Sequence, residues 1–399
     1  MLSIRLAGPE KKWTNLLLSE ATLNLVTISI TLGVLVFAIG LLAADGEIRR
    51  DQRVFIALFL GLYLAIKLEK LYIMLEGYTV APHLLGLTYP IKLCLAPAVY
   101  FYARSLASSQ PAWPGRSDWP ALMAPLAAAL VATPFYILPG TEKMALFAPE
   151  AVNTDQYALA ILGCQIGLAL FVATALVYLK STHSLIKQHR ERLLDLFSRI
   201  EDKTADWLRR IILVLAVGWT LDAVLEGFAL ADIRPPYLYS LSLLLELAWI
   251  SFIAFNAIRQ RSIHGLESTE TPGQPSAAKR ETRSGLSAER MRSIASKLDE
   301  TMSKRQLFLD PELSLRDLSD ATGASEHHLS ETFSQFHAQN FFDYINGLRV
   351  NRACDMLKDP DRNILDVAFE VGFNSRSTFN SAFKKHVGQT PSQFRRQQD

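Results

Sequence analysis

This chain of 399 residues has very little cysteine and lacks the common catalytic motifs. Of its three cysteines, Cys94 and Cys164 fall in long apolar stretches and Cys354 falls in the polar C-terminal part, so no disulfide framework is indicated. No HExxH, GxSxG, P-loop or histidine-kinase-like pattern is present. We therefore expect a protein that is not an enzyme and has no metal or cofactor.

Apolar residues, by contrast, are abundant, at 50% of the chain, and the mean hydropathy is +0.15. They gather into runs before residue 259, each near the roughly 20 residues that cross a bilayer as a helix. The expected membrane spans are Leu23–Ala44, Val54–Leu75, Leu84–Leu106, Trp119–Leu138, Gln156–Leu179, Ile211–Ala231 and Tyr237–Ile258. The second is the least secure, because Lys67, Glu69 and Lys70 interrupt it. A soluble helical core is the alternative interpretation.

Basic residues in the connections predict the orientation of these spans. They gather in the first loop, between the fifth and sixth spans and after the seventh: Arg49, Arg50, Arg53, Lys180, Lys187, Arg190, Arg192, Arg199, Lys203, Arg209, Arg210, Arg259 and Arg261. The alternate connections carry only Lys143 and Arg234, and the N-terminal Arg5, Lys11 and Lys12 oppose the trend weakly. The pattern predicts a multi-pass protein of a bacterial cytoplasmic membrane, with its N-terminus outside and its C-terminus in the cytosol.

The composition divides the chain into three parts. Residues 1–261 form the expected membrane domain. From Ser262 to Gly285 the chain is rich in Ser, Thr, Pro, Gly and charged residues, which is typical of a flexible linker. Residues 286–399 form the expected cytosolic domain, which opens with an amphipathic helix whose apolar face carries Met291, Ile294, Leu298 and Met302.

This C-terminal part contains the same helical unit twice. The first copy begins at Ser314, has Asp317 three positions later and reaches Gly323; the second has Asn363, Asp366 and Gly372 at the same spacing. A capping residue with an acid three positions on predicts a helix start, and glycine predicts its end. Further helices open at Ser325 and Ser375. Two tandem helix-turn-helix units predict an all-α domain that binds DNA.

The second helix of each copy is the expected recognition helix. In the first, about Glu326 to Phe336, we expect Leu329, Phe333 and Phe336 to face the core. In the second, Phe379 and Phe383 should do so. The residues expected to face DNA are His327, His328, Ser330, Glu331, Arg376, Ser377, Asn380 and Ser381, with Lys384 and Lys385 at the end of the second helix. A helix from Phe341 to Leu357 would be about 25 Å long. It would hold the two recognition helices one DNA turn apart, about 34 Å.

Two sets of residues in this part form a recognisable pattern: Ile364–Phe373, Ser375, Phe379, Phe383–Lys385, Gly388 and Thr390–Arg395 make the first, and Asn340–Asn346 and Leu348–Val350 make the second. Together they resemble the signature of the AraC/XylS transcription regulators. The resemblance covers about 100 residues. It implies a two-lobed, seven-helix domain acting on promoters, with the recognition-helix residues above placed at base edges. A plain solvated helix face is the alternative for each of them. Residues 286–399 are not basic, but Asn374–Arg396 carries no acid, so the second lobe should supply most of the affinity.

Ionisable residues within the spans are the candidate sensing site, since such residues are costly in a membrane and usually functional. They are Lys67, Lys92, Asp222, Glu226 and Glu246. Asp222 and Glu226 share one helix face because they are four residues apart. Two interpretations stay open: a salt-bridge network that holds the bundle together, and an outward-facing pocket for a small polar ligand or a proton.

The sequence therefore predicts an all-α protein with an N-terminal bundle of seven transmembrane helices and a C-terminal double helix-turn-helix domain. Its predicted function is that of a membrane-anchored one-component transcription regulator. The expected partners are double-stranded promoter DNA, membrane lipid, RNA polymerase, a second copy of the chain and an unknown small-molecule or proton signal. The alternative is a transporter or membrane receptor with a regulatory tail, although a transporter would predict two related halves with interrupted helices, and none is evident.

Overall fold

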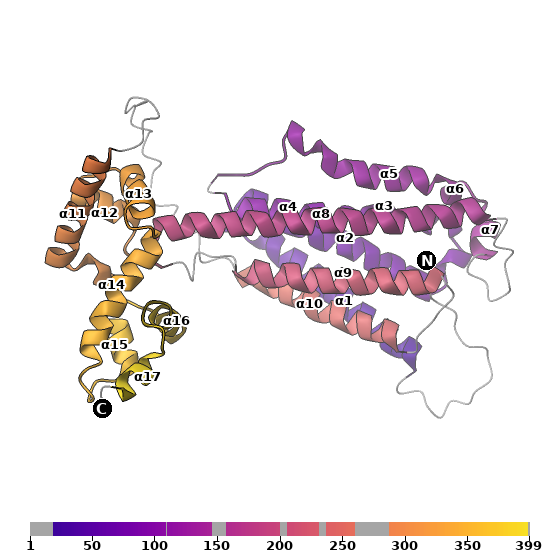
Figure 1. Ribbon diagram of the computed structural model, residues 1–399. Helices are drawn as coiled ribbons and strands as arrows, with labels where there is room; N and C mark the ends of the chain where they lie inside the picture. The colour runs from indigo at the N-terminus through magenta and orange to yellow at the C-terminus, as the bar shows by residue number, and fades with distance from the viewer. Residues whose placement is uncertain are drawn as a thin grey trace. The chain divides into compact units, whose positions relative to one another are not determined.

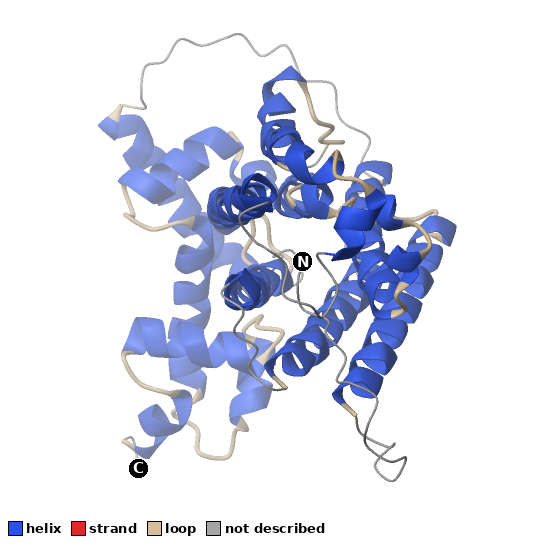
Figure 2. Cartoon of the chain, turned by 90° about the vertical axis from the view of Figure 1, so that its right-hand side faces the viewer, coloured by secondary structure: helices blue, strands red, loops and turns tan. Residues whose placement is uncertain are grey.

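The computed structural model describes residues 19–108, 110–145, 157–199, 206–230, 237–259 and 287–397. Over these residues the chain is helical and has no strand beyond one isolated bridge (Figure 2). It divides into two compact units, a bundle unit of residues 1–186 and 205–269 and a C-terminal unit of residues 187–204 and 270–399. The expected linker, 262–285, lies outside the described residues.

Long helices make up most of the bundle unit (Figure 1). They are α1 (Glu20–Ala44), α2 (Arg50–Met74), α4 (Leu95–Leu106), α8 (Ala158–Leu196), α9 (Asp206–Leu230) and α10 (Leu238–Arg259). The shorter elements are η2 (Gly77–Thr79), η3 (Pro82–Leu84), α3 (Tyr89–Lys92), η4 (Arg116–Leu122), α5 (Met123–Val131), α6 (Thr133–Tyr136) and α7 (Gly140–Ala145). Helix α1 packs against α2 and α10, and α2 also packs against α4.

The outside of this bundle is apolar. On α1, Phe37 is 67% exposed, and on α9, Leu213 is 67% exposed, while the polar side chains of Thr27 and Thr31 are buried. A helix of a soluble domain shows the reverse arrangement, with its apolar stripe turned inward. Large exposed apolar surfaces mark contact with a membrane or a partner. This distribution is compatible with insertion into a bilayer.

The number of helices fit to cross a membrane is smaller than the seven expected. Four described helices are long and apolar enough, α1, α8, α9 and α10, and the pair Pro82–Lys92 and Leu95–Leu106, bent by 41°, makes a fifth if it is one span. Helix α2 has the length, but its charged residues Lys67, Glu69 and Lys70 lower its hydropathy. The fourth expected span is broken into η4, α5 and α6, because prolines at 120, 125 and 134 interrupt the helical hydrogen bonds.

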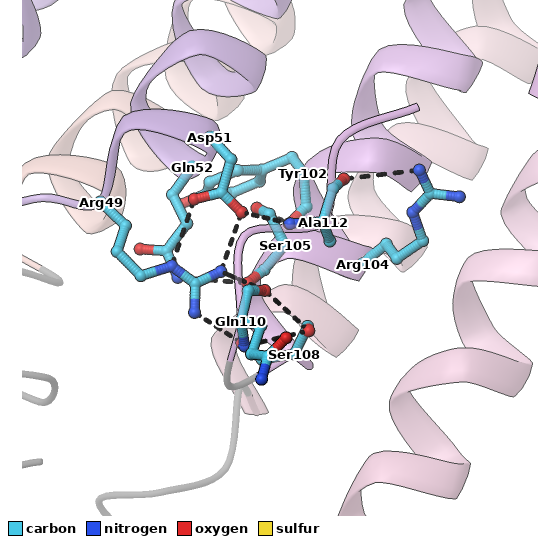
Figure 3. Close-up of polar contacts among 9 residues, drawn as sticks. All are labelled: Arg49, Asp51, Gln52, Tyr102, Arg104, Ser105, Ser108, Gln110 and Ala112. Carbon is cyan, nitrogen blue, oxygen red and sulfur yellow. Dashed lines mark hydrogen bonds and ion pairs between the residues drawn. The ribbon is translucent and has the colours of Figure 1, made fainter. Parts of the chain in front are cut away.

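A polar network fixes the start of α2 to the end of α4 (Figure 3). Arg49 pairs with Asp51 at 2.8 Å and donates to the backbone oxygens of Ser105 and Ser108 at 2.7 and 2.6 Å. Asp51 also accepts from the amide of Ala112 at 2.9 Å. The first loop and the chain beyond α4 therefore lie at the same end of the bundle unit, as an alternating path of spans requires.

The C-terminal unit consists of two lobes that share one helix (Figure 1). Its helices are α11 (Ala288–Arg305), η7 (Leu307–Leu309), α12 (Leu315–Thr322), α13 (Glu326–Gln335), α14 (Phe341–Met356), α15 (Ile364–Glu370), α16 (Arg376–Val387) and α17 (Pro391–Arg396). The first core contains Leu298, Leu318 and Phe333. The second contains Val367, Phe379 and Phe383. Helix α14 contributes Phe341 and Ile345 to the first and Val350 and Ala353 to the second, which also contains Leu357, the residue that follows α14.

The caps of the two repeats lie where their sequences predict. Ser314 and Asp317 form a capping box at the start of α12, which ends at Gly323 with φ +68°. Asn363 caps α15, and Gly372 follows it with φ +94°. Phe336 differs from the expectation: it is 48% exposed, because α13 ends at Gln335 and Phe336 follows the last helical turn instead of continuing the buried face.

Candidate nucleic-acid interface

Helix α16, the expected second recognition helix, presents a polar face at its N-terminal end. Ser375 caps the helix by accepting from the amide of Thr378 at 3.1 Å. Phe379 and Phe383 are fully buried, stacked edge to face with Phe373 and Phe394 respectively. Because these aromatic rings fix the rotation of the helix, the opposite face is turned outward. That face carries Arg376, Ser377 and Ser381, which are exposed, and Asn380, which is half-buried.

The cations at the end of α16 differ in their surroundings. Lys384 and Lys385 are both exposed, but Lys385 forms an ion pair with Asp343 of α14 at 2.6 Å. Burial lowers the pKa of His386 below its usual value, so this imidazole is neutral at pH 7. Arg376 and Lys384 form no ion pair with another described residue. They are the two cations of this helix best placed to meet an anionic polymer.

Helix α13, the expected first recognition helix, is arranged in the same way but carries no Lys or Arg. Leu329 and Phe333 are buried in the first core. His327 is exposed, whereas His328, Ser330 and Glu331 are half-buried. The Glu331 carboxylate accepts from the Gln335 amide at 3.0 Å. This helix can offer hydrogen bonds to base edges but cannot neutralise phosphates.

Three residues of the α8–α9 connection also belong to this unit, and sequence reasoning did not place them there. Phe197, Ser198 and Arg199 contact the segment before α12, and Ser198 hydrogen-bonds to Arg349 of α14. In the sequence, Leu348–Val350 stands out only as part of the family signature, and the connection stands out only because it is rich in basic residues. No periodicity or motif links two segments 151 residues apart, so nothing in the sequence pattern could have found the pair.

In the bundle unit, the five ionisable residues singled out from the sequence do come together. Lys67 pairs with Glu246, and Lys92 pairs with Glu226. Asp222 accepts from the Ser242 hydroxyl at 3.4 Å. Lys92, Asp222, Glu226 and Glu246 line one cavity, and Lys67 reaches it through Glu246. The residues of this cluster come from α2, α3, α9 and α10.

The cavity is small. Its free volume is about 20 Å³, which is room for about one water molecule. Small-molecule sites usually enclose several hundred Å³. In this conformation the cluster can hold a proton or a water, and a larger ligand would require the helices to separate.

Further residues line the same cavity and were not among the sequence candidates. Lys70 lies there with its ammonium 5.6 Å from the ring centre of Tyr239. Trp219 donates its indole N–H to the Tyr63 hydroxyl at 2.6 Å. Lys70 was noted in the sequence only as an interruption of a span, and helical spacing from Lys67 could have added it. Among the described residues, no three His, Cys, Asp or Glu side chains gather as metal ligands would.

Comparison with known proteins identifies the C-terminal unit. A family of helix-turn-helix domains matches residues 318–397. The chain is 33% identical over 90 residues to the probable transcription factor PqrA of Proteus vulgaris, covering 23% of this chain and 74% of that protein. It is 32% identical over 87 residues to the melibiose operon regulatory protein of Escherichia coli K12, covering 22% of this chain and 29% of that protein.

Two further similarities each cover about a quarter of this chain. An uncharacterized HTH-type transcriptional regulator of Staphylococcus aureus (strain COL) is 37% identical over 90 residues, covering 23% of this chain and 12% of that protein. A solved structure of a protein of unknown function from Listeria innocua aligns at 27% identity with a TM-score of 0.23, covering 27% of this chain and 94% of that one. The chain thus spans most of PqrA but only 29% of the melibiose regulator and 12% of the staphylococcal protein.

Proposed function

This chain belongs to the AraC-type helix-turn-helix transcription regulators, and from that premise we propose that it is a membrane-anchored one-component regulator. Its C-terminal unit binds promoter DNA sequence-specifically through both helix-turn-helix motifs. Its bundle unit anchors it in the cytoplasmic membrane of a bacterium and senses a signal. The observation that carries the proposal is the exposed polar face of α16, set by the buried Phe379 and Phe383.

The two recognition helices take different parts in binding. Arg376, Ser377, Asn380 and Ser381 read base edges in one major groove, and Lys384 holds the phosphates. His327, His328, Ser330 and Glu331 face the next groove and add selectivity with little affinity, because α13 carries no cation. Lys385 joins the phosphate contacts only when it leaves Asp343. A second copy of the chain would compensate for the modest affinity of one, and RNA polymerase is the partner at the promoter.

For the bundle unit we propose seven crossings, with the N-terminus outside and the C-terminal unit in the cytosol. Helix α2 is long enough for a crossing at 25 residues, and its Lys67 is buried in an ion pair with Glu246, so the charge need not face lipid. The remaining crossing is the broken segment from Arg116 to Tyr136. The basic first loop supports the orientation.

The cluster of Lys67, Lys92, Asp222, Glu226 and Glu246 is the sensing site of this proposal. The size of its cavity favours a proton as the signal over a metabolite. Protonation of one carboxylate would remove an ion-pair partner and change the relative stability of two packings of the bundle. A signal shifts such an equilibrium only by its differential affinity for the two states.

The decisive experiment is genome-wide crosslinking of the full-length protein to DNA in intact membranes, with the Arg376→Ala variant as the matched control. The proposal expects a small set of enriched promoter fragments that share a motif, and loss of that enrichment in the variant. A parent protein that enriches no sequence above the variant would show that this chain does not act as a sequence-specific regulator.

A further inference from the structure

The described start of the α8–α9 connection is built into the C-terminal unit. Phe197 forms an isolated antiparallel bridge with Ser314, the capping residue of α12. The amide and the hydroxyl of Ser198 both donate to the Leu313 backbone oxygen, at 3.1 and 2.6 Å. Ser198 is only 2% exposed. This segment is therefore packed into the first lobe rather than lying on its surface.

Ser198 also contacts the helix that the two lobes share. The Arg349 guanidinium, which is 1% exposed, donates to the Ser198 backbone oxygen at 3.4 Å and to its hydroxyl at 3.2 Å. It further donates to the backbone oxygens of Phe308 and Asp310 at 2.7 and 2.6 Å. One buried cation thus ties the connection, the segment before α12 and α14 together.

The next residue reaches the second lobe. Arg199 forms an ion pair with Glu312 of the first lobe. With its carboxamide oxygen turned toward the guanidinium, Asn374 accepts from Arg199 Nη1 at 2.6 Å. Asn374 directly precedes Ser375, the cap of the second recognition helix. Three consecutive residues of the connection therefore contact the first lobe, the shared helix and the start of α16.

Asp195, just before these residues, lies near the first recognition helix. Residues 187–196 of α8 belong to the C-terminal unit. Asp195 lines a cavity of about 300 Å³ together with Ser330 and Ser334 of α13. Ser330 is one of the residues expected to reach base edges. A DNA phosphate that approached Ser330 would meet the Asp195 carboxylate, which carries the same sign of charge and repels it.

We propose that residues Asp195–Arg199 form an autoinhibitory clamp on the DNA-binding unit. The docked clamp holds the two lobes in a fixed relation and keeps the Asp195 carboxylate near Ser330 of α13, so both recognition helices engage DNA only after it is released. Because α8 and α9 flank the clamp and also contribute to the bundle unit, a rearrangement of the bundle would release it without any force passing through residues 262–285. This inference rests on the proposed DNA-binding function.

The first test locks the clamp with a disulfide between Phe197→Cys and Ser314→Cys, in a full-length chain whose three native cysteines are replaced by alanine. Residues opposed across an antiparallel bridge have Cα atoms about 4.5–5.5 Å apart, within the range of a disulfide. Affinity for duplexes of about 40 base pairs from a randomised pool, long enough for two successive major grooves, is measured in nanodiscs with and without reductant. Both forms lack the Ser314 side chain that caps α12, so the reduced form is the matched control for the loss of that cap.

We expect the oxidised form to bind DNA about tenfold more weakly than the reduced form. Failure of the disulfide to form would show that the clamp is not docked. Equal affinity of the two forms would overturn autoinhibition while leaving the DNA-binding function intact. Absence of any binding in both forms would overturn the proposed function itself, and this inference with it.

The second test exchanges the charges of the Arg199–Glu312 pair. Arg199→Glu and Glu312→Arg each oppose like charges, so each should release the clamp and raise DNA affinity, whereas the double variant should return toward the parent. Glu312→Arg also adds a cation, and the double variant controls for that addition. If Arg199→Glu lowered DNA affinity or left it unchanged, the clamp would be structural only.

Discussion

Arg349 Nη2 donates to Ser198 Oγ at 3.2 Å and joins two segments that lie 151 residues apart in the sequence. The same guanidinium donates to the backbone oxygens of Phe308 and Asp310. A buried cation is tolerated when its donors are satisfied, and backbone oxygens can satisfy them as carboxylates do. Arg349 therefore acts as the centre of the C-terminal unit, where the connection, the first lobe and the shared helix α14 meet.

Replacement of Arg349 by methionine should destabilise the C-terminal unit by about 3–5 kcal/mol, because it leaves several buried backbone oxygens without donors. Ser198→Ala removes only one hydroxyl and should cost about 1–2 kcal/mol. The urea dependence of pulse proteolysis on the full-length chain measures both. Equal and small losses in the two variants would show that the guanidinium is not the centre of this network.

Two glycines with similar backbone angles should respond differently to alanine. Gly372 has φ +94°, and a Cβ there would lie 2.7 Å from the Leu309 backbone oxygen. Gly388 has φ +83° and nothing within 4 Å of the same position. Gly388→Ala should cost about 1–2 kcal/mol from backbone strain alone. Gly372→Ala should cost about 2–5 kcal/mol, because overpacking against Leu309 adds to that strain.

These glycine variants are compared by the thermal unfolding of the C-terminal unit, with proteolysis as the readout. The difference between them isolates the steric contact between the α15–α16 turn and the segment before α12. If Gly388→Ala lowered the stability of the unit more than Gly372→Ala did, that result would contradict the close contact between Gly372 and Leu309.

Local signals made the C-terminal unit predictable from sequence. Ser314 forms a capping box with Asp317, and Asn363 accepts from the amide of Leu365, so both helix starts depend on contacts within four residues, and glycines mark the turns. The position of Phe336 was not predictable, because it depends on whether α13 continues for one more residue. The break within the segment 116–136 was not predictable, because hydropathy does not show that prolines interrupt a helix there. Contacts such as Ser198–Arg349 depend on tertiary packing, which no local pattern encodes.

Arg376 and Lys384, the exposed cations of α16 that form no ion pair with another described residue, should have different effects on DNA binding. Arg376→Ala should weaken binding to a selected site by about 1–3 kcal/mol and relax the preference at one position. Lys384→Ala should weaken binding to all sequences similarly and reduce the salt dependence. Fluorescence anisotropy with selected and random duplexes over a salt series tests both. Equal losses on the two duplexes for Arg376→Ala would rule out its contact with a base.

Lys385→Ala is the matched control for Lys384→Ala, since both side chains are exposed and adjacent. Lys385 pairs with Asp343 at 2.6 Å, so its removal should change the salt dependence less. If Lys385→Ala reduced that dependence more than Lys384→Ala did, the ion pair would have to open on DNA and Lys385 would be the main phosphate contact.

The orientation of the bundle unit can be tested with reporter fusions. A cytosolic reporter joined after Arg261, and another after Gln188 near the C-terminal end of α8, should both be active, and a periplasmic reporter at either site should not be. Fusions after Glu142 are the matched control and should give the opposite result. Periplasmic activity after Arg261 would contradict the proposed topology, because the DNA-binding unit would then lie outside the cytosol.

The buried Lys67–Glu246 pair separates a structural role from a sensing role. Glu246→Gln leaves the Lys67 ammonium without its carboxylate, and breaking a buried pair from one side typically costs about 3–5 kcal/mol. We therefore expect little protein to accumulate in the membrane. Replacing both partners, Lys67→Met with Glu246→Leu, should restore accumulation, because a pair of apolar residues requires no compensating charge.

Transcription from a target promoter is then measured in the double variant at external pH values that do and do not activate the parent. If the cluster detects protons, the double variant inserts normally but no longer responds to pH. A double variant that responds like the parent would leave the pair a purely structural contact, and the sensing site would have to lie elsewhere in the chain.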